Sequence, residues 1–330
     1  MPEVSVIIPA FNAAESIRRA IDSILTGTFA DLECVVVDDG STDGTAEVVR
    51  AIDDDRVRLI ESKHQGVAQA MNEGVAHAQG NLIARMDADD RSHQERLERQ
   101  VEALKSQQLD VVGGLVCIVD SGGNPVESLN RYESWVNSCR THAEICAYRF
   151  VESPVVNPTA LARREVFELQ CRDGDLPEDY DLWLRAIQAG CQFGKVDEIV
   201  LDWIDGPGRL TRTNRRYSFA AFNRCRREHL LKGPLANSVR CNLWGAGQTG
   251  KPWLRWLLDA GLKVDFVVEV SPRKIGREIH GVKVIGHEQL PEANGDPLLI
   301  AVGAPGAREQ IKPVLIGSGY RPGKDAWFVA

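Results

Sequence analysis

The sequence predicts an α/β protein with a mostly parallel sheet, followed by a second and smaller α/β domain. Unbroken apolar runs such as VSVIIPA and VVGGLVCIV are typical of strands that are buried on both faces. Amphipathic segments with helical spacing separate these runs, and this regular alternation indicates βαβ units. The alternation breaks off and then resumes near residue 239, which indicates two domains.

The elements of the first domain are expected in a regular order. Apolar runs predict strands at VSVIIPA, LECVVV, VRLIE, NLIARM and VVGGLVCIV. Apolar residues at helical spacing predict helices over about residues 14–25, 45–52, 67–78 and 94–106. The pattern is irregular over about residues 122–175. A further helix, LPEDYDLWLRAIQAG, has Pro177 in its first turn and Gly190 as its stop.

The chain is expected to divide at a short linker over residues 233–238. The first domain would cover residues 1–232 and end in a basic helical segment over about 209–232, which holds eight basic residues and one acid. The second domain would cover residues 239–330. It begins with the strand VRCNLW and continues with the helix TGKPWLRWLLDAG and the strand VDFVVEV.

Composition excludes several classes of protein. The 330 residues can form two cores, and the contents of 43% hydrophobic and 26% charged residues are ordinary for a globular protein. A net charge of −8 disfavours nonspecific binding to nucleic acid. No apolar run reaches the ~18 residues that cross a bilayer, and the first residues lack the features of a signal peptide. Eight cysteines without a C-x-x-C pair disfavour a zinc site and fit a reduced, cytoplasmic protein.

Acidic residues follow the second and fourth of the expected strands. Asp38 and Asp39 end one strand, and Asp87, Asp89 and Asp90 end the other. The carboxyl ends of parallel strands meet at one edge of a sheet, where ligands bind. Asp87 and Asp89 are two residues apart and project to the same side of an extended chain. They suit a divalent cation that carries a diphosphate. The alternative is a solvated turn beside an acidic helix N-terminus.

Four segments of the chain carry a resemblance to a known family. VSVIIPAFNAAESIRRAIDSIL, VVVDDGSTDGT, ARMDADD and LPEDYDLWLRA resemble, in order and approximate spacing, the motifs of family 2 glycosyltransferases. The resemblance covers roughly residues 1–215 and implies the GT-A nucleotide-diphospho-sugar transferase fold. It implies inverting transfer of a sugar from a nucleotide-diphospho-sugar, expected to be a UDP-sugar, to an acceptor hydroxyl in polysaccharide or glycoconjugate biosynthesis. The implied cofactor is Mn²⁺ or Mg²⁺.

The resemblance also implies the roles of individual residues. The positions that match the region holding the nucleotide base are Pro9, Phe11 and Asp39. Asp87 and Asp89 match the D-x-D that binds the ribose and the metal on the diphosphate. Asp179 matches the general base that takes the proton from the acceptor. A purely structural alternative applies to Asp179, because the dipole favours acids in the first turn of any helix, and Asp181 is the next candidate for the base.

The match departs from the family in two places. Where many members have A-R-N, this chain has Met71 between Ala70 and Asn72, so we expect Arg85 to contact phosphate instead. A histidine that often follows the base is also missing. We expect Arg209 and Arg212 to hold the diphosphate, because arginine binds phosphate oxygens bidentately. The alternative is a basic helix surface that contacts solvent, an acidic neighbour or anionic lipid at the membrane periphery.

The second domain contains a glycine-rich fingerprint in the expected context. Gly245, Gly247 and Gly250 lie between a strand and a helix, and Glu269 ends the next strand, where an acid binds ribose in Rossmann-like domains. A nucleotide is therefore a candidate ligand of this domain. The alternative is that the glycines only permit tight packing. We expect no hydride transfer, because the lone histidines His280 and His287 are poor candidates for handling a substrate proton.

Two other functions remain as alternatives. A sugar-phosphate nucleotidyltransferase usually carries a glycine-rich loop with Lys or Arg after its first strand, and PAFNAAESI lacks one. A non-catalytic nucleotide-sugar sensor would not need the D-x-D and the E-D pair. The Q-x-x-R-W motif of processive synthases is absent, so we expect the addition of a single sugar. The acceptor, whether a sugar, a lipid-linked molecule or a protein, is not indicated.

Overall fold

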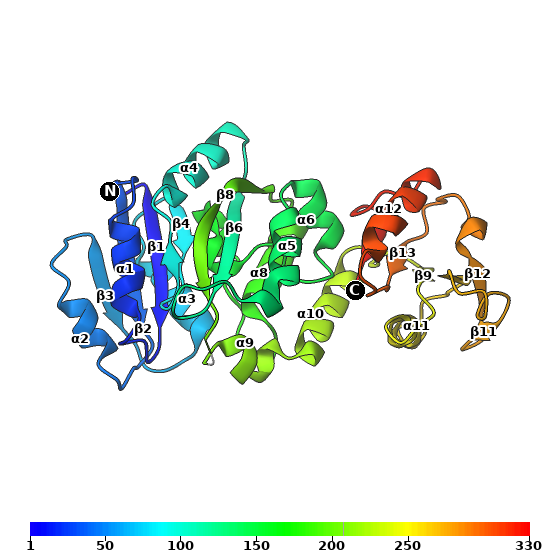
Figure 1. Ribbon diagram of the computed structural model, residues 1–330, viewed down its shortest axis with the longest axis horizontal. Coiled ribbons are helices and arrows are strands. Elements are labelled where there is room, and N and C mark those ends of the chain that lie inside the picture. Colours follow the sequence, from blue (N-terminus) through cyan, green and yellow to red (C-terminus); the bar gives the residue numbers. More distant parts are fainter. Residues whose placement is uncertain (207) are drawn as a thin grey trace. The chain divides into compact units, whose positions relative to one another are not determined.

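The computed structural model describes residues 1–206 and 208–330 of the chain. It has two compact units (Figure 1): unit 1 comprises Met1–His142 and Pro154–Cys225, and unit 2 comprises Ala143–Ser153 and Arg226–Ala330. The expected domain limits at residues 232 and 239 remain a prediction, because a compact unit is not by itself a domain that folds alone.

Unit 1 is built on an eight-stranded mixed sheet. Its strands are β1 (Val4–Ala10), β2 (Leu32–Asp38), β3 (Val57–Glu61), β4 (Leu82–Arg85), β5 (Arg91–Ser92), β6 (Val111–Val119), β7 (Leu161–Arg163) and β8 (Phe193–Ile204). Their order is β3-β2-β1-β4-β7-β6-β8-β5. The pairs β1–β2, β2–β3, β1–β4 and β6–β8 are parallel, whereas β7 is antiparallel to β4 and β6, and β5 to β8. The predicted α/β class is confirmed.

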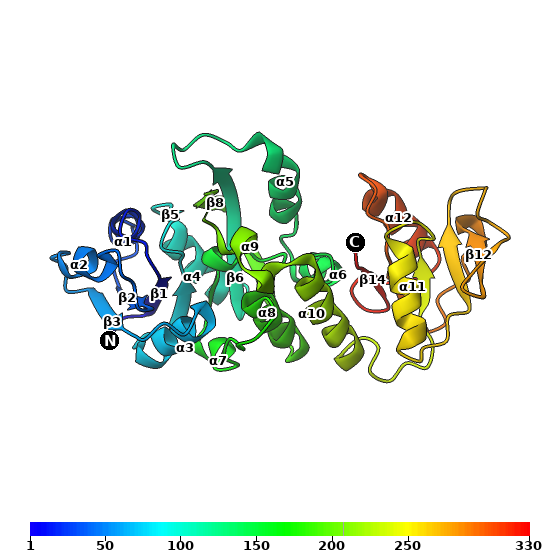
Figure 2. The ribbon, with the colours of Figure 1, turned by 90° about the horizontal axis from the view of Figure 1, so that it is seen from below.

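Helices cover both faces of this sheet. They are α1 (Ile17–Leu25), α2 (Thr45–Arg50), α3 (Val67–His77), α4 (Arg96–Ser106), α5 (Asn130–Ser138), α7 (Arg164–Phe167), α8 (Glu178–Gln188) and α9 (Leu210–Thr213). Apolar residues of α1 and α4 form one core with the even-numbered residues of β1. Helix α3 packs on the opposite face, so closely that a Cβ on Gly74 would lie 2.3 Å from the Ile7 side chain. Figure 2 shows α1 and α3 on opposite sides of β1 and β2.

Three details of unit 1 differ from the expected elements. Helix α1 begins at Ile17 and not near residue 14, because the N–H groups of Ala13 and Ala14 donate to side chains of the loop after β2. Pro177 lies just before α8 and not in its first turn. Strand β7 lies within the stretch that had no readable pattern, and its three residues are too few to show a period.

Unit 2 contains a six-stranded sheet with the order β11-β12-β10-β9-β13-β14. The strands are β9 (Asn242–Trp244), β10 (Phe266–Glu269), β11 (Glu278–Ile279), β12 (Val282–Gly286), β13 (Leu298–Ile300) and β14 (Ala326–Phe328), and the helices are α11 (Gly250–Asp259) and α12 (Ala307–Gly317). The first strand, β9, is central: β10 and β12 lie on one side of it, and β13 and β14 on the other. In such doubly wound sheets, ligands bind where the order reverses, at the carboxyl end of the first strand.

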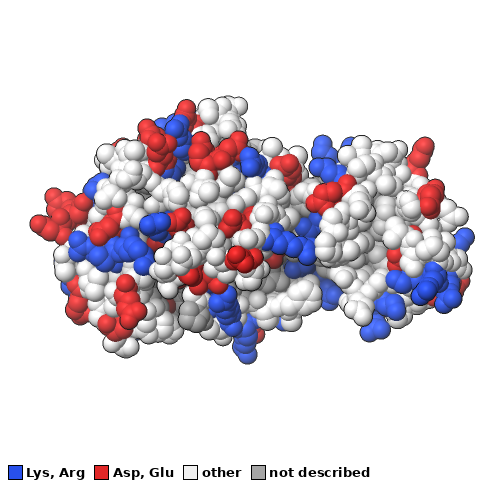
Figure 3. Space-filling view, viewed as in Figure 1, with Lys and Arg blue, Asp and Glu red and all other residues white. Residues whose placement is uncertain are grey.

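Helices α6 (His142–Tyr148) and α10 (Phe219–Lys232) contain points where the chain passes from one unit to the other. The eight cysteines, all within the described residues, are free thiols. Among the described helices, none combines the length and the apolar character needed to cross a membrane. Acidic and basic side chains are interspersed over the face drawn in Figure 3.

Candidate functional site

Three carboxylates follow β4 at the carboxyl edge of the sheet. Asp87, Asp89 and Asp90 each place one ligand oxygen within 4.8 Å of the other two. Asp90 is buried, with 1% exposure, and its Oδ1 accepts a hydrogen bond from the Ile204 N–H at 2.8 Å. Its Oδ2 is buried and has no hydrogen-bond partner among the described residues. Such a set of oxygen ligands suits Mg²⁺ or Mn²⁺.

The three acids repel one another. Burial, followed by the charge of Asp87, raises the pKa of Asp89 to about 6. Burial, followed by the charges of Asp87 and Asp89, raises the pKa of Asp90 well above its ordinary value. Asp89 is nonetheless the most exposed of the three, so a ligand can reach it. A bound divalent cation would offset the repulsion and favour the ionised carboxylates.

Arg85 supports the acidic cluster from inside the sheet. Its Nη2 lies 2.5 Å from Asp87 Oδ1, and its Nη1 donates to the Met86 carbonyl. Arg96 on α4 donates to the Arg85 carbonyl at 2.7 Å, and burial lowers the pKa of Arg96 to about 10. With 3% exposure, Arg85 fixes the position of Asp87. The contact between Arg85 and a phosphate remains a prediction.

Asp179 lies at the start of α8, near the acidic cluster. Burial, followed by the charges of Glu178 and Asp87, raises the pKa of Asp179 to about 7. The Tyr180 N–H donates to Asp179 Oδ1 at 2.7 Å, and the positive charge of Arg85 also favours the carboxylate. Since Asp87 and Arg85 both act on Asp179, the fold brings the expected base close to the expected metal ligands. A carboxyl that titrates near neutral pH suits a general base.

Glu178, beside Asp179, has a structural role. The Tyr217 hydroxyl donates to Glu178 Oε1 at 2.7 Å, and Arg216 Nη1 lies 3.4 Å from Oε2. Burial raises the pKa of Glu178. The two acids of the E-D pair therefore differ in their contacts. Glu178 connects α8 to the basic segment, while Asp179 keeps one oxygen available for a ligand.

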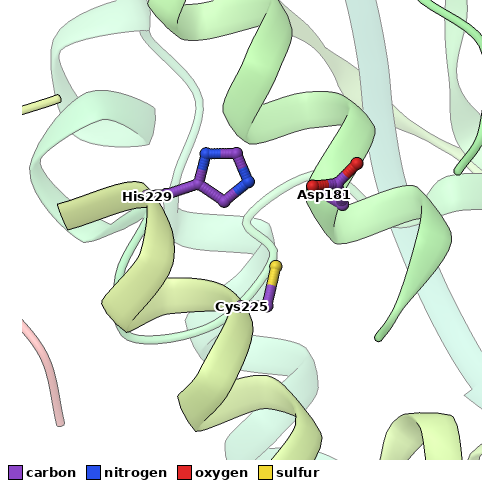
Figure 4. Close-up of side chains that lie close together, drawn as sticks. All are labelled: Asp181, Cys225 and His229. Atoms are coloured by element: carbon purple, nitrogen blue, oxygen red, sulfur yellow. The ribbon is translucent and has the colours of Figure 1, made fainter. Parts of the chain in front are cut away.

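Asp181, the next candidate for the base, is also engaged. It is fully buried and forms ion pairs with Arg172 and with Arg185, the latter at 2.8 Å. Figure 4 shows Asp181 on α8 and Cys225 on α10, where a carboxylate oxygen and the thiol lie within 4.8 Å of each other. These contacts make Asp181 part of the packing of α8, and they leave Asp179 as the better candidate.

Asp39, at the carboxyl end of β2, organises a loop at the expected base site. Its Oδ1 accepts from the Gln65 N–H and its Oδ2 from the Gly66 N–H, both at 2.8 Å. Pro9 is buried near the end of the neighbouring β1. The carboxylate thus holds the segment that precedes α3 beside the ends of β1 and β2.

His64 joins this region, although the sequence did not single it out. Its ring stacks on Phe11 with centroids 4.2 Å apart, and its Nδ1 lies 3.0 Å from Asp39 Oδ2. Phe11 is 48% exposed, so an aromatic surface remains open beside the carboxylate. A lone histidine in a loop carries no sequence signal, and only the fold brings it to Phe11.

Two arginines in the segment after β8 share one carboxylate, that of Asp205. Arg209 lies over the Trp203 ring at 4.1 Å and 3.2 Å from Asp205, and Arg212 lies 2.7 Å from the same carboxylate. The positive charge of Arg209 offsets part of the increase in the pKa of Asp89, which indicates that the two side chains are close. A basic group is therefore present near the acidic cluster, and the contact of either arginine with phosphate remains a prediction.

The glycines of unit 2 serve different purposes. Gly245 has φ +125°, and a Cβ there would lie 2.5 Å from the Ala301 carbonyl oxygen. A Cβ on Gly250 would lie 1.8 Å from the Gly245 oxygen. The packing alternative therefore explains these two glycines. A Cβ on Gly247, by contrast, would meet only Lys274 Nζ, at 3.9 Å, so its small size leaves open space above the loop.

Glu269 ends β10 as expected, but its carboxylate is already engaged. Oε1 accepts from the N–H groups of Val270 and Ser271, and Oε2 accepts from Lys274 at 2.8 Å. The pair of Glu269 and Lys274 thus lies beside the open space at Gly247. A ribose contact from Glu269 remains a prediction.

The match that decides the family spans half of the chain. A model of the family described as glycosyl transferase family 2 matches residues 5–169. The chain belongs to glycosyltransferase family 2. The resemblance inferred from four segments is thereby confirmed. The matched range contains Asp39, Asp87 and Asp89 but ends before Asp179.

Individual relatives agree with this assignment. An uncharacterized glycosyltransferase of Haemophilus influenzae is 32% identical over 200 residues, which are 58% of this chain and 62% of the relative. The chain thus spans less than two thirds of that protein's length. S. aureus TarS 1-349 in complex with UDP-GlcNAc has a TM-score of 0.56 at 19% identity, covering 71% of this chain and 67% of TarS. The mannosyltransferase PcManGT from Pyrobaculum calidifontis was solved in complex with GDP-Man and Mn²⁺. It has a TM-score of 0.50 at 24% identity, and the likeness covers 70% of this chain and 62% of PcManGT. These likenesses confirm the GT-A fold of this family 2 member.

Proposed function

We propose that this family 2 chain is a metal-dependent, inverting glycosyltransferase that moves a sugar from a nucleotide-diphospho-sugar to an acceptor hydroxyl. The observation that carries the proposal is the meeting of three carboxylate oxygens, at Asp87, Asp89 and Asp90, within 4.8 Å. Asp179, with a pKa near 7, is influenced electrostatically by the same cluster. This pairing supplies one group for the leaving diphosphate and another for the acceptor.

The acidic cluster fits a divalent cation. Asp90 Oδ2 is buried and has no partner among the described residues, and the pKa values of Asp89 and Asp90 are raised by crowding of negative charge. Asp87, Asp89 and Asp90 would hold Mn²⁺ or Mg²⁺, which offsets the charge that develops on a leaving diphosphate. PcManGT, which shares the fold, was solved with GDP-Man and Mn²⁺. Arg209 and Arg212 would bind the diphosphate oxygens.

The donor's base would lie in the region of Phe11, His64 and Asp39. An exposed aromatic ring offers a stacking surface, and the Asp39 carboxylate accepts hydrogen bonds at its edge. TarS was solved with UDP-GlcNAc, and this supports a UDP-sugar as the first donor to test.

Asp179 would act as the base in a single displacement. The acceptor hydroxyl oxygen forms a bond to the anomeric carbon and gives its proton to the Asp179 carboxylate. The bond between that carbon and the diphosphate oxygen breaks, and its electron pair leaves with the nucleoside diphosphate. One base and one displacement invert the anomeric centre. The Glu178 and Asp87 charges favour a protonated Asp179 after transfer, because like charges disfavour ionisation.

A donor panel tests this proposal. The full chain would be incubated with UDP-GlcNAc, UDP-glucose and GDP-mannose, in Mn²⁺ and in EDTA, and release of the nucleoside diphosphate would be measured. We expect slow hydrolysis of one donor that depends on Mn²⁺, even without an acceptor. Ligand-induced stabilisation against heat reports binding separately. A donor that stabilises the protein but is never cleaved, with any acceptor sugar, lipid-linked sugar or peptide, would favour a non-catalytic sensor.

The nucleotidyltransferase alternative has little support. The loop after β1 is fixed by hydrogen bonds to Asp43 and Thr45, and it contains neither Lys nor Arg to bind a triphosphate. We further propose that unit 2 binds a nucleotide without hydride transfer, with its phosphate on the glycine loop at the start of α11. The open space at Gly247 is the observation that favours this binding. A role in cytoplasmic polysaccharide or glycoconjugate biosynthesis completes the proposal.

A further inference from the structure

A cavity beside α11 is lined by residues of that helix, by Arg227 and by Gln248 of the glycine loop. It has a volume of about 420 Å³ and lies entirely within unit 2. Lys251, Arg255 and Asp259 line it from successive turns of the helix. Trp253 and Leu257 of the same helix are buried. The cavity therefore lies on the exposed side of α11 and borders the glycine loop at Gln248.

Arg227 of α10 lines the same cavity and is unusual within the basic segment 209–232, which is fully described. The other arginines and the lysine of this segment each have an acidic side chain or a backbone carbonyl as partner. Arg227 has none: its guanidinium lies over the rings of Trp253 and Trp256, at 5.2 and 5.4 Å. Its Nε is buried without a hydrogen-bond partner among the described residues.

The charges around the cavity are unbalanced. Arg227, Lys251 and Arg255 have no ion pair among the described residues, and Asp259 is the only acid in the lining. Burial, followed by the charge of Arg226, lowers the pKa of Arg227, as expected when no carboxylate is near. In a chain of net charge −8, three unpaired cations around one hollow represent a local excess of positive charge.

The lining also offers an apolar surface. Pro252 and the half-buried Trp256 complete the wall beside the cations. A guanidinium with free N–H groups, two further cations and an aromatic wall match a phosphate or diphosphate attached to a less polar group. An acidic peptide would present single carboxylates along an extended surface, whereas this site is a compact hollow.

We propose that this cavity binds a phosphate or diphosphate group, either of a free small molecule or of a lipid headgroup. The site lies in unit 2, and it differs from the phosphate site expected at the glycine loop because its donors are the side chains of Arg227, Lys251 and Arg255. Its binding energy comes from charge-assisted hydrogen bonds to Arg227, Lys251 and Arg255, and the group that carries the phosphate rests against Trp256.

The test uses the full chain in EDTA, so that no metal can recruit a diphosphate to the acidic cluster. In one arm, inorganic diphosphate is titrated by calorimetry. In the other, flotation is measured with phosphatidylcholine vesicles that contain one fifth phosphatidic acid, and with pure phosphatidylcholine. The cavity variant is Arg227→Gln/Lys251→Gln/Arg255→Gln. The matched control, Arg277→Gln/Lys283→Gln/Lys324→Gln, removes the same charge from other positions of unit 2.

We expect the wild type and the control to bind in at least one arm, and the cavity variant to bind at least about tenfold more weakly. Binding of diphosphate indicates a soluble ligand, and flotation only with phosphatidic acid indicates a lipid. Because Arg227 also packs on two tryptophans, Arg255→Glu serves as a second variant: it reverses an exposed charge and leaves those contacts intact. Equal loss in the cavity variant and the control, unchanged binding by Arg255→Glu, or no binding in both arms would overturn the proposal.

Discussion

Replacement of Asp179 by Asn isolates the proton transfer from the binding of the donor. The amide keeps the shape of the side chain and can still accept from the Tyr180 N–H, but it cannot take up a proton. General bases contribute about 10²–10⁴-fold, so turnover should fall by at least about 10² while the affinity for a nucleoside diphosphate stays near that of the wild type. The matched control is Asp175→Asn, which removes an exposed acid three residues before the helix.

The pH dependence of kcat/KM in the wild type tests the same role of Asp179 quantitatively. With a pKa of about 7, roughly 9% of Asp179 is ionised at pH 6 and roughly 91% at pH 8, so kcat/KM should rise about tenfold between these values. A saturating metal would remove part of the repulsion from Asp87 and shift the midpoint to lower pH. A flat profile from pH 6 to 8 at low metal, or an Asn variant with more than about a tenth of wild-type turnover, would refute the assignment.

The same raised pKa affects stability, and the sign can be stated. Asp179 titrates near 3.8 in an ordinary environment and near 7 in the fold. The folded state thus holds the proton more tightly, and the stabilisation from this group is lost as the pH rises through 7. The Tm of Asp179→Asn relative to the wild type should therefore increase between pH 5 and pH 8. A Tm difference that stays constant over this pH range would show that the pKa of Asp179 is not raised in the folded state.

Four further predictions concern other parts of the two units. Asp89→Ala should abolish transfer and the Mn²⁺ dependence of nucleoside diphosphate binding, measured by calorimetry, without unfolding; unchanged Mn²⁺ dependence would remove Asp89 from the metal site. His64→Ala should weaken UDP binding by about tenfold through loss of a stacking surface of about 1–2 kcal/mol, whereas His77→Ala, on α3, should not. Gly247→Val should erase nucleotide binding to unit 2, assayed as thermal stabilisation by NAD, UDP and UDP-sugars in an Asp89→Ala background. In contrast, Gly250→Ala should lower the Tm of the chain even without ligand, because its Cβ would lie 1.8 Å from a carbonyl oxygen.

Much of the fold followed from local patterns, and the exceptions have physical reasons. The long parallel strands of unit 1 are unbroken apolar runs because helices cover both of their faces. Strand β7 has three residues and pairs antiparallel with two neighbours, so its position depends on contacts between distant segments. The start of α1 depends in the same way on Asp43 and Thr45, which lie about thirty residues away in the chain.

The residues of the candidate site were likewise predictable from the sequence only where they lie in a local motif. Asp87, Asp89 and Asp179 lie in short motifs, so a comparison of motifs suggested them. Asp90 and His64 could not be assigned from the sequence, because their roles depend on burial and on one stacked ring. The engagement of Asp181 and of Glu178 was likewise invisible, since their arginine and tyrosine partners follow from packing.

The way in which Asp39 is bound has a consequence for the choice of nucleotide. Each of its oxygens already accepts one backbone N–H, and Oδ2 also lies 3.0 Å from His64 Nδ1, so the acceptor capacity that remains for a ligand lies mainly at Oδ1. A base edge that presents an N–H, as in uracil or guanine, can add to this arrangement without disturbing the loop. Cytosine and adenine present a ring-nitrogen lone pair on the corresponding edge, so they could donate to the carboxylate only through their amino groups. The loop before α3 would then favour a base that donates a ring N–H over one that can donate only through an amino group.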